Sequence, residues 1–346
     1  MNNVQTETKI KKESKNRIRV EFERTPLIDR LRAKFVNLYF FQKIGVYAFK
    51  FIFLLGISYV ILFPFFSKIS TSFMSPEDFV DVTVIMIPRN PTLSTYTAIF
   101  RDNGYMTAFT NTLVLSLTCA ILQTFVCCLV GYGFAKFKFK FNGLLFLLVI
   151  FSMVVPHSTL RLSMFMKFKF FDVFGIIGFL HDQLGLFKHG FLSLVNTYWP
   201  MVLLSATGLG FKNGLYIFML RQYFKGVPDE LEESAYLDGC GVFRTFLQII
   251  LPLSVPMLIT VFMFSFSWQW TDTFYTSVFF SQQGPTLMPS IIKVPRSLST
   301  GYAAQNLYES AIRNTCGIMI LLPLLVLYTF LQRYIIQGIE RSGITG

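Results

Sequence analysis

The sequence carries little charge for its length. Only 14% of its 346 residues are Asp, Glu, Lys or Arg, which is about half the charged fraction of an average soluble domain. Hydrophobic residues make up 53% of the chain and collect in long runs. Several runs reach the roughly 20 residues that a helix needs to cross the hydrocarbon core of a bilayer. The composition therefore excludes an ordinary soluble domain and predicts a membrane protein.

The residues of common catalytic and redox chemistry are also scarce. Of the five cysteines, four lie in apolar runs and Cys240 lies in a polar loop, which argues against a disulfide framework. The three histidines show none of the spacings typical of a metal site. The nearest approach to a phosphate-binding loop, Gly208 to Gly214, lies inside an apolar run and lacks the final Ser or Thr. We therefore expect no catalytic residue, metal or cofactor in this chain.

Positive charge is concentrated at the N-terminal end. The net charge is +12, and eleven Lys or Arg with five acidic residues fall within residues 1–45, ahead of the first apolar run. Such a cluster holds a terminus in the cytosol and attracts anionic lipid headgroups rather than nucleic acid. Apolar residues recur at helical spacing from Leu27 to Leu38, so we predict an amphipathic helix at the interface. No secretory signal is visible, because the apolar run begins too late.

The apolar runs predict an all-α, polytopic fold with six membrane-spanning helices. Lys136, Lys138 and Lys140 follow the second run directly and place that loop in the cytosol, so both termini are expected there too. We expect the proline-containing loop 67–105 to be external and irregular, and 164–194 to form an external interfacial or partly re-entrant helix. The predicted domains are the basic segment 1–45 and a six-span domain 46–346. The six spans are predicted at about 46–66, 107–135, 143–163, 195–221, 253–280 and 311–337.

The longest polar island between apolar runs is the stretch 227–252. Pro228 suits the first turn of a helix, and Asp229 with Glu232 is spaced as a capping box. Gly239 accepts the left-handed conformation that ends a helix. A second amphipathic segment follows, and we expect it to stop at Leu251 and Pro252. Two short helices with a glycine elbow beneath a membrane are typical of a docking element.

The order of motifs in this island resembles the EAA loop of the membrane subunits of ABC importers. That pattern is Glu-Ala-Ala, then Gly, and later Ile-x-Leu-Pro; here Ser234 replaces the first alanine. Flanking stretches narrow the resemblance to the carbohydrate-uptake branch, in the maltose-permease-like group. The matching stretches are Glu233–Ala235, Asp238–Gly239, Ile250–Pro252, Asn196–Trp199, Leu220–Phe224 and Gln332–Tyr334.

The resemblance implies a multi-pass subunit of a bacterial cell membrane that has no catalysis of its own. Its partners would be a second related permease, two cytosolic ATPase subunits that bind ATP and Mg, and an extracellular solute-binding protein. In that family the loop sits in a cleft of the ATPase. By this resemblance, Glu233 would make the polar contact with the ATPase, and Ser234 and Ala235 would lie against its surface. Asp238 would brace the turn and Gly239 would form the elbow. Leu251 and Pro252 would end the second helix, which passes the movement to the fifth span.

A possible sugar path combines one cation with residues of the fifth span. Lys212 lies inside the fourth predicted span, where a cation costs at least about 2.5 to 3.5 kcal/mol, so it should face a watery cavity or pair with an acid or carbonyl of the partner. Aromatic rings stack on sugars while amides and carboxylates bind hydroxyls, but an interfacial aromatic belt explains the same residues. The fifth-span candidates are Trp268, Gln269, Trp270, Asp272 and Tyr275.

Two other functions are weighed against a sugar importer subunit. A secondary transporter would need inverted repeats, and no internal repeat is visible in the sequence. A membrane-embedded enzyme would need a convergent catalytic set. The sequence leaves open which sugar is carried, including whether it is an acidic oligosaccharide.

Overall fold

The computed structural model describes residues 38–173, 175–184, 190–210, 212–281, 284–298, 301 and 304–341. The chain divides into two units, residues 1–66 and 67–346. The described residues form helices, with one isolated antiparallel bridge between Phe171 and Leu192. The predicted all-α class is therefore confirmed, and the amphipathic helix predicted before Leu38 lies outside the described residues.

The described part of the first unit belongs to helix α2, Leu38–Thr71. Its apolar side chains are exposed on all sides from Ile44 to Phe66. A helix that is apolar all round has no face for water, which is the property of a membrane span. Residues Gln42–Thr71 are long and apolar enough to cross a bilayer, as the predicted first span requires.

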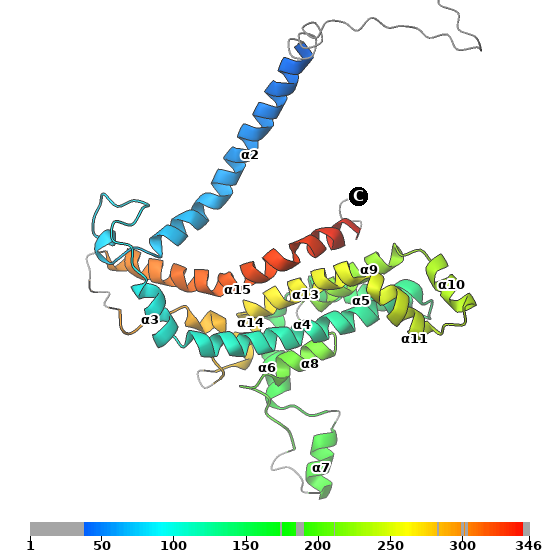
Figure 1. Cartoon of the computed structure of the whole chain (residues 1–346). Coiled ribbons are helices and arrows are strands. Elements are labelled where there is room, and N and C mark those ends of the chain that lie inside the picture. The colour runs from blue at the N-terminus through cyan, green and yellow to red at the C-terminus, as the bar shows by residue number, and fades with distance from the viewer. Residues whose placement is uncertain are drawn as a thin grey trace, which may run out of the picture. The chain divides into compact units, whose positions relative to one another are not determined.

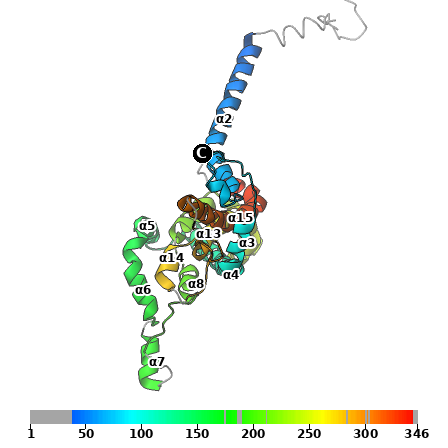
Figure 2. The same ribbon diagram turned by 90° about the vertical axis from the view of Figure 1, so that its left-hand side faces the viewer.

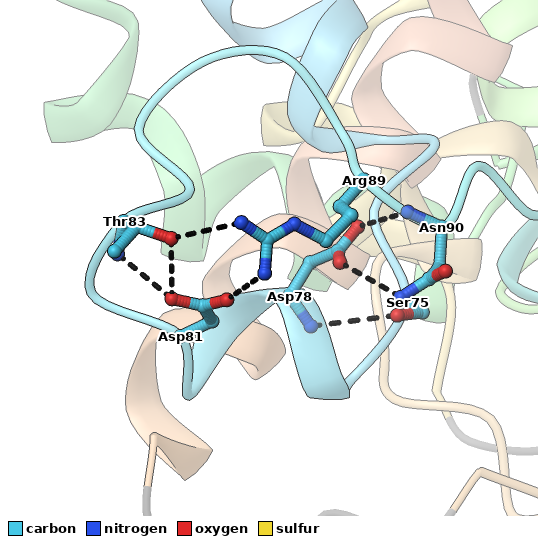
Figure 3. A network of polar contacts seen from close by, with 6 residues as sticks. All are labelled: Ser75, Asp78, Asp81, Thr83, Arg89 and Asn90. Carbon is cyan, nitrogen blue, oxygen red and sulfur yellow. Dashed lines mark hydrogen bonds and ion pairs between the residues drawn. The ribbon is translucent and has the colours of Figure 1, made fainter.

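The second unit begins with an ordered loop, which was predicted to be external (Figure 3). The buried Asp78 carboxylate accepts hydrogen bonds from the backbone and side-chain amides of Asn90. Hydrogen bonds from Thr83, together with the charge of Arg89, hold the pKa of Asp81 below its usual value. The loop was predicted to be irregular, but it contains helix α3, Ser94–Asp102, because Ile99 is buried there against α15.

The core of the second unit forms around α4, Tyr105–Lys136 (Figure 1). Helix α4 packs against α8, α9 and α13, and α13 packs against α15. The other helices are α5 Asn142–Val154, α6 Arg161–Lys169, α7 Ile176–Leu184, α8 Trp199–Ala206, α9 Asn213–Lys225, α10 Glu230–Leu237, α11 Val242–Thr245, α12 Leu251–Leu253, α13 Val255–Trp270, α14 Phe274–Phe279 and α15 Gln305–Arg341.

The described residues include three helices that are long and apolar enough to cross a membrane, and five spans if each of two bent pairs counts as one. The predicted third span bends by 91° between Val154 and His157, since Pro156 forces the residue before it out of the helical conformation. The predicted fourth span is not continuous but consists of α8 and α9, with 207–212 between them. The number of six spans stays a prediction.

Side chains of α4 and α13 donate hydrogen bonds to backbone carbonyls of α15 at the centre of this unit. Pro323 lies inside α15 and has no N–H to donate to the carbonyl of Met319. The hydroxyl of Tyr105 in α4 donates to that carbonyl at 3.1 Å. The indole N–H of the fully buried Trp270 donates to the next carbonyl, that of Ile320, at 2.9 Å. These bonds fix α4 and α13 to α15.

The segment predicted as an interfacial or re-entrant helix contains α6 and α7. Phe171, which precedes α7, and Leu192, which follows it, form an antiparallel backbone bridge at the base of this segment. Figures 1 and 2 both show α7 standing apart from the other helices of the second unit. Its Ile176 and Phe179 are exposed. An interfacial position for this helix stays a prediction.

Candidate functional site

The polar island 227–252 folds as two short helical segments at the end of α4 away from α3 (Figure 1). We call residues 227–254 the coupling loop, after the role that the sequence predicts for this stretch. Its first helix, α10, does not begin with the predicted capping box. Asp229 has helical backbone angles and no side-chain bond to the first turn, while its backbone carbonyl accepts from the amides of Glu232 and Glu233 at 3.0 Å. The capping prediction was wrong because both carboxylates bind α4 instead.

The elbow after α10 forms as predicted at Gly239, which has a φ of +80°. The amide of Cys240 donates to the carbonyl of Ala235 at 2.9 Å, and that of Gly239 donates to Tyr236 at 3.0 Å. These bonds satisfy the last carbonyls of α10 as a left-handed residue after a helix allows. The chain then enters α11 at Val242.

The second segment does not stop at Leu251 and Pro252 as predicted. Helix α11 continues through a π-helical stretch, Phe246–Ile250, into α12, which ends at Leu253. The hydroxyl of Ser254 donates to the carbonyl of Ile250 at 2.6 Å. The axis then bends by 75° into α13. The wider π turn precedes Pro252, whose missing N–H already removes one regular helical bond.

The inward face of α10 is tied to the C-terminal end of α4 by the contacts of three residues, which we call the α4 clamp: Tyr132, Lys136 and Glu232. The Tyr132 hydroxyl donates to Oε1 of Glu232 at 2.5 Å. The Lys136 ammonium lies 3.3 Å from Oε2 of Glu232 and donates to the carbonyl of Val227 at 2.7 Å. The side chains of Lys136 and Glu232 are only 8% and 9% exposed. The pair is therefore largely removed from water.

A third contact of Lys136 reaches the surface. Its ammonium donates to Oδ1 of Asp229 at 2.5 Å, and this hydrogen bond and charge lower the pKa of Asp229. The Asp229 side chain is 77% exposed, so solvent screens the pair and its contribution to stability is small. Asp229 is consequently ionised at neutral pH.

Sequence reasoning missed the α4 clamp, since Lys136 counted there only as a sign of cytosolic topology. One signal could have found it. Tyr132 and Lys136 are four residues apart, so they share a face of α4. Glu232 and Ala235 likewise share the buried face of α10.

The outward face of α10 carries other predicted residues of the loop. Glu233, Ser234 and Leu237 lie opposite Glu232 and are exposed, with Leu237 at 89%. Phe243 of α11 is 69% exposed, and Val242 and Leu247 are exposed too. Asp238, Gly239 and Pro252 are exposed as well, whereas Ala235 is buried in this chain and Leu251 is half-buried. The loop thus presents an apolar surface beside an acidic side chain.

The structure brings two of the predicted path residues together. The Lys212 ammonium lies 4.7 Å from the ring centre of Trp268, which is 49% exposed. Lys212 does not sit within a continuous helix, as the sequence predicted, but at the break before α9 with a φ of +68°. A non-glycine residue rarely adopts this conformation, and such residues cluster at ligand sites. At 1.5 Å per residue, Lys212 lies about 20 Å along α9 from its end at Lys225.

The other predicted path residues have structural contacts. Trp270 is fully buried between Phe109 and Phe266. The Asp272 carboxylate accepts from the amides of Tyr275 and Thr276 in the first turn of α14. Gln269 is half-buried with its amide nitrogen 3.4 Å from the sulfur of Met201, and Tyr275 is buried. Among the five predicted residues of the fifth span, only Trp268 is exposed, and about half of its surface is accessible.

The helical unit with its exposed loop between α9 and α13 defines a membrane permease of the ABC importer type. The family model for "binding-protein-dependent transport system inner membrane component" matches residues 127–341. The chain belongs to this family, and its location is a membrane. The matched region includes the coupling loop, the α4 clamp and the Lys212–Trp268 pair.

Named relatives agree with this assignment. The arabinooligosaccharides transport system permease protein AraQ of Halalkalibacterium halodurans is 28% identical over 293 residues, covering 84% of this chain and 93% of the relative. The polygalacturonan/rhamnogalacturonan transport system permease protein YtcP of Bacillus subtilis is 23% identical, with 85% and 96% covered. The predicted resemblance to carbohydrate ABC importer permeases is thus confirmed.

A solved structure shares the fold. A chain of a bacterial ABC transporter involved in the import of the acidic polysaccharide alginate matches with a TM-score of 0.61 at 18% identity. The match covers 84% of this chain and 96% of the other. The predicted ABC permease fold is therefore confirmed.

Proposed function

We propose that this chain is one membrane subunit of an ATP-driven, binding-protein-dependent sugar importer, and that its coupling loop docks on a cytosolic ATPase. A second related permease, two ATPase copies and an extracellular solute-binding protein complete the assembly, with both termini of this chain in the cytosol. ATP and Mg bind in the ATPase, so this chain supplies no catalysis. It converts ATPase movement into alternating access of the sugar path.

The exposed apolar surface of the coupling loop carries this proposal. Leu237 and Phe243 are among the most exposed large apolar side chains outside the apolar spans. Exposed apolar clusters rimmed by polar residues mark protein interaction sites. The inward face of the same helix is fixed by charged contacts to α4, so the outward face is held in a defined orientation. Glu233 beside Leu237 adds a negative charge for a basic partner group.

Loss of the apolar anchor is expected to release the ATPase. Leu237→Asp should lower ATPase recovery in affinity purification of the whole importer about tenfold or more, since central interface residues contribute about 2 kcal/mol or more. Glu233→Lys should act in the same direction. Asp182→Lys, a charge reversal at an exposed site on α7, serves as the control and should leave recovery unchanged. Undiminished ATPase recovery with Leu237→Asp, or proton-driven uptake by this chain alone, would contradict the proposal.

For the substrate, the named relatives and the Lys212–Trp268 pair support an oligosaccharide. An exposed indole offers an apolar ring for a sugar face, and the ammonium beside it binds hydroxyl groups or a uronate carboxylate. A cation about 20 Å from the end of α9, and therefore within the membrane, needs an aqueous cavity or an anionic partner. We therefore place Lys212 and Trp268 on the translocation path and extend the substrate class to acidic oligosaccharides.

Removal of the Lys212 charge tests this placement. Lys212→Met keeps a long apolar stem, so packing on Trp268 is retained while the charge is lost. Uptake of acidic oligosaccharides by vesicles containing the complete importer should fall about tenfold, since a charged hydrogen bond contributes about 1.5 to 3 kcal/mol. Uptake of neutral oligosaccharides should fall less. Equal uptake of both kinds by Lys212→Met and the unmodified importer would remove Lys212 from the path.

A further inference from the structure

We propose that the α4 clamp transmits the movement of the coupling loop into α4, so that the loop drives two helices rather than α13 alone. This inference rests on the proposed function. The loop is joined to α13 through the chain itself at Ser254. It is joined to α4 by polar contacts between residues about 100 positions apart in sequence. Tyr132, Lys136 and Glu232 are thereby assigned as positioning residues for coupling.

The chemistry of the clamp makes it a firm connection. The Lys136 ammonium donates hydrogen bonds to the carbonyl of Val227 and the carboxylate of Asp229, and it forms an ion pair with Glu232. The Tyr132 hydroxyl binds the other oxygen of Glu232. A buried ion pair that loses one partner leaves an uncompensated charge, so the two halves resist separation. The clamp therefore holds α10 against α4 when the loop is displaced.

Packing around Tyr132 extends this connection. Its ring lies 4.8 Å from that of Phe246 in the second segment of the loop and 5.5 Å from that of Phe224 at the end of α9. Both segments of the loop thus contact one side chain of α4. A displacement of either segment reaches α4 through close-packed rings, which deform little.

Helix α4 carries the connection toward the proposed sugar path. Gln123 lies on α4 about 20 Å from Lys136 toward the other end. Its amide nitrogen donates to the Ser205 hydroxyl of α8 at 3.0 Å, and its carbonyl accepts from Ser265 of α13. These three side chains are buried. Ser205 lies just before the break that contains Lys212, and Ser265 lies on α13, the helix that carries Trp268. Movement of α4 therefore reaches both proposed path residues, Lys212 and Trp268.

The test uses the complete importer in vesicles and measures sugar taken up per ATP hydrolysed. Lys136→Met and Glu232→Gln should leave ATPase bound and hydrolysing but lower this ratio at least about fivefold, the lower range of coupling between two sites. Lys225→Met, which removes an exposed lysine at the end of α9, should leave the ratio unchanged. Lys136→Arg, which keeps the positive charge and the donors for Val227, Asp229 and Glu232, should keep most of the ratio that Lys136→Met loses, which a role of the lysine stem in packing alone would not predict.

A second variant covers the case in which Lys136→Met fails to assemble. Tyr132→Phe keeps the ring contacts and removes only the hydroxyl bond to Glu232, so the complex should assemble with a ratio about twofold or more below that of the unmodified importer. An unchanged ratio in every assembled clamp variant would overturn the inference. If the unmodified importer itself takes up no sugar with ATP, the proposed function fails instead, so the two failures are distinguishable.

Discussion

Replacement of Gly131 by leucine is expected to prevent the second unit from folding. A Cβ at Gly131 would lie 2.8 Å from the Cβ of Leu220 and 3.2 Å from the backbone nitrogen of Arg221. Neither atom is at the flexible end of a side chain, so α4 and α9 must separate. Overpacking of this kind costs about 1 to 3 kcal/mol for small additions and more for large ones. The yield of monodisperse protein in detergent should fall nearly to zero.

Alanine at the same position gives a graded test of this steric argument. Gly131→Ala should yield folded protein with a lower unfolding temperature in detergent, because only one carbon is added. Gly133→Ala is the matched control, since a Cβ at Gly133 meets no atom within 4 Å. Alanine favours the helix over glycine by up to about 1 kcal/mol, so this variant should be slightly more stable. Equal unfolding temperatures for the two alanine variants would contradict the close packing of α4 on α9.

Trp270→Ala is expected to have the second large effect. The indole is fully buried, lies edge-on to Phe109, stacks on Phe266 and donates to the carbonyl of Ile320. Truncation of a buried tryptophan costs about 3 to 5 kcal/mol, and here it also removes a bond between α13 and α15. Denaturant unfolding in detergent should show this loss of stability directly.

Trp268→Ala separates the structural tryptophan from the proposed path residue. Trp268 lies two positions earlier in α13 but is 49% exposed and holds the ammonium of Lys212. Its removal should change stability by much less than Trp270→Ala while lowering sugar uptake. A large loss of stability from Trp268→Ala, with little loss from Trp270→Ala, would show that the two positions have the opposite roles.

The two faces of α10 have separable consequences under the proposed function. Outward substitutions such as Leu237→Asp act on ATPase recovery, whereas inward substitutions such as Glu232→Gln act on uptake per ATP. Both readouts come from one purified complex. The exposed surface and the α4 clamp are therefore tested independently even though four residues or fewer separate them on one short helix.

The sequence predicted much of the coupling loop because its features are local. A glycine accepts a positive φ wherever the chain needs one, and Gly239 has it. The order of the loop motifs and of their flanking stretches predicted the family, which the match over residues 127–341 confirms. The capping box failed because local spacing does not show that Lys136, some 93 positions earlier, competes for Asp229.

The predicted sugar path shows the same limit. Trp268 and Trp270 were both predicted on the sugar path because of their residue type. Residues two positions apart on a helix, however, point about 200° apart and so face nearly opposite sides. One indole is exposed beside Lys212 and the other is enclosed by α4 and α15. Periodicity in an apolar span cannot separate these faces, because the sides toward lipid, protein and a path are all apolar or aromatic.

The sequence by itself determined the membrane class, the all-α fold, the family and the place of the coupling loop, because hydrophobic length and short motifs are written in consecutive residues. Only the tertiary structure decided that α8 and α9 are separate helices, that Glu232 and Ala235 face inward, and that Tyr132 and Lys136 hold the loop. The reason is physical: a buried charge is stable only beside its partner, and folding alone brings distant partners together.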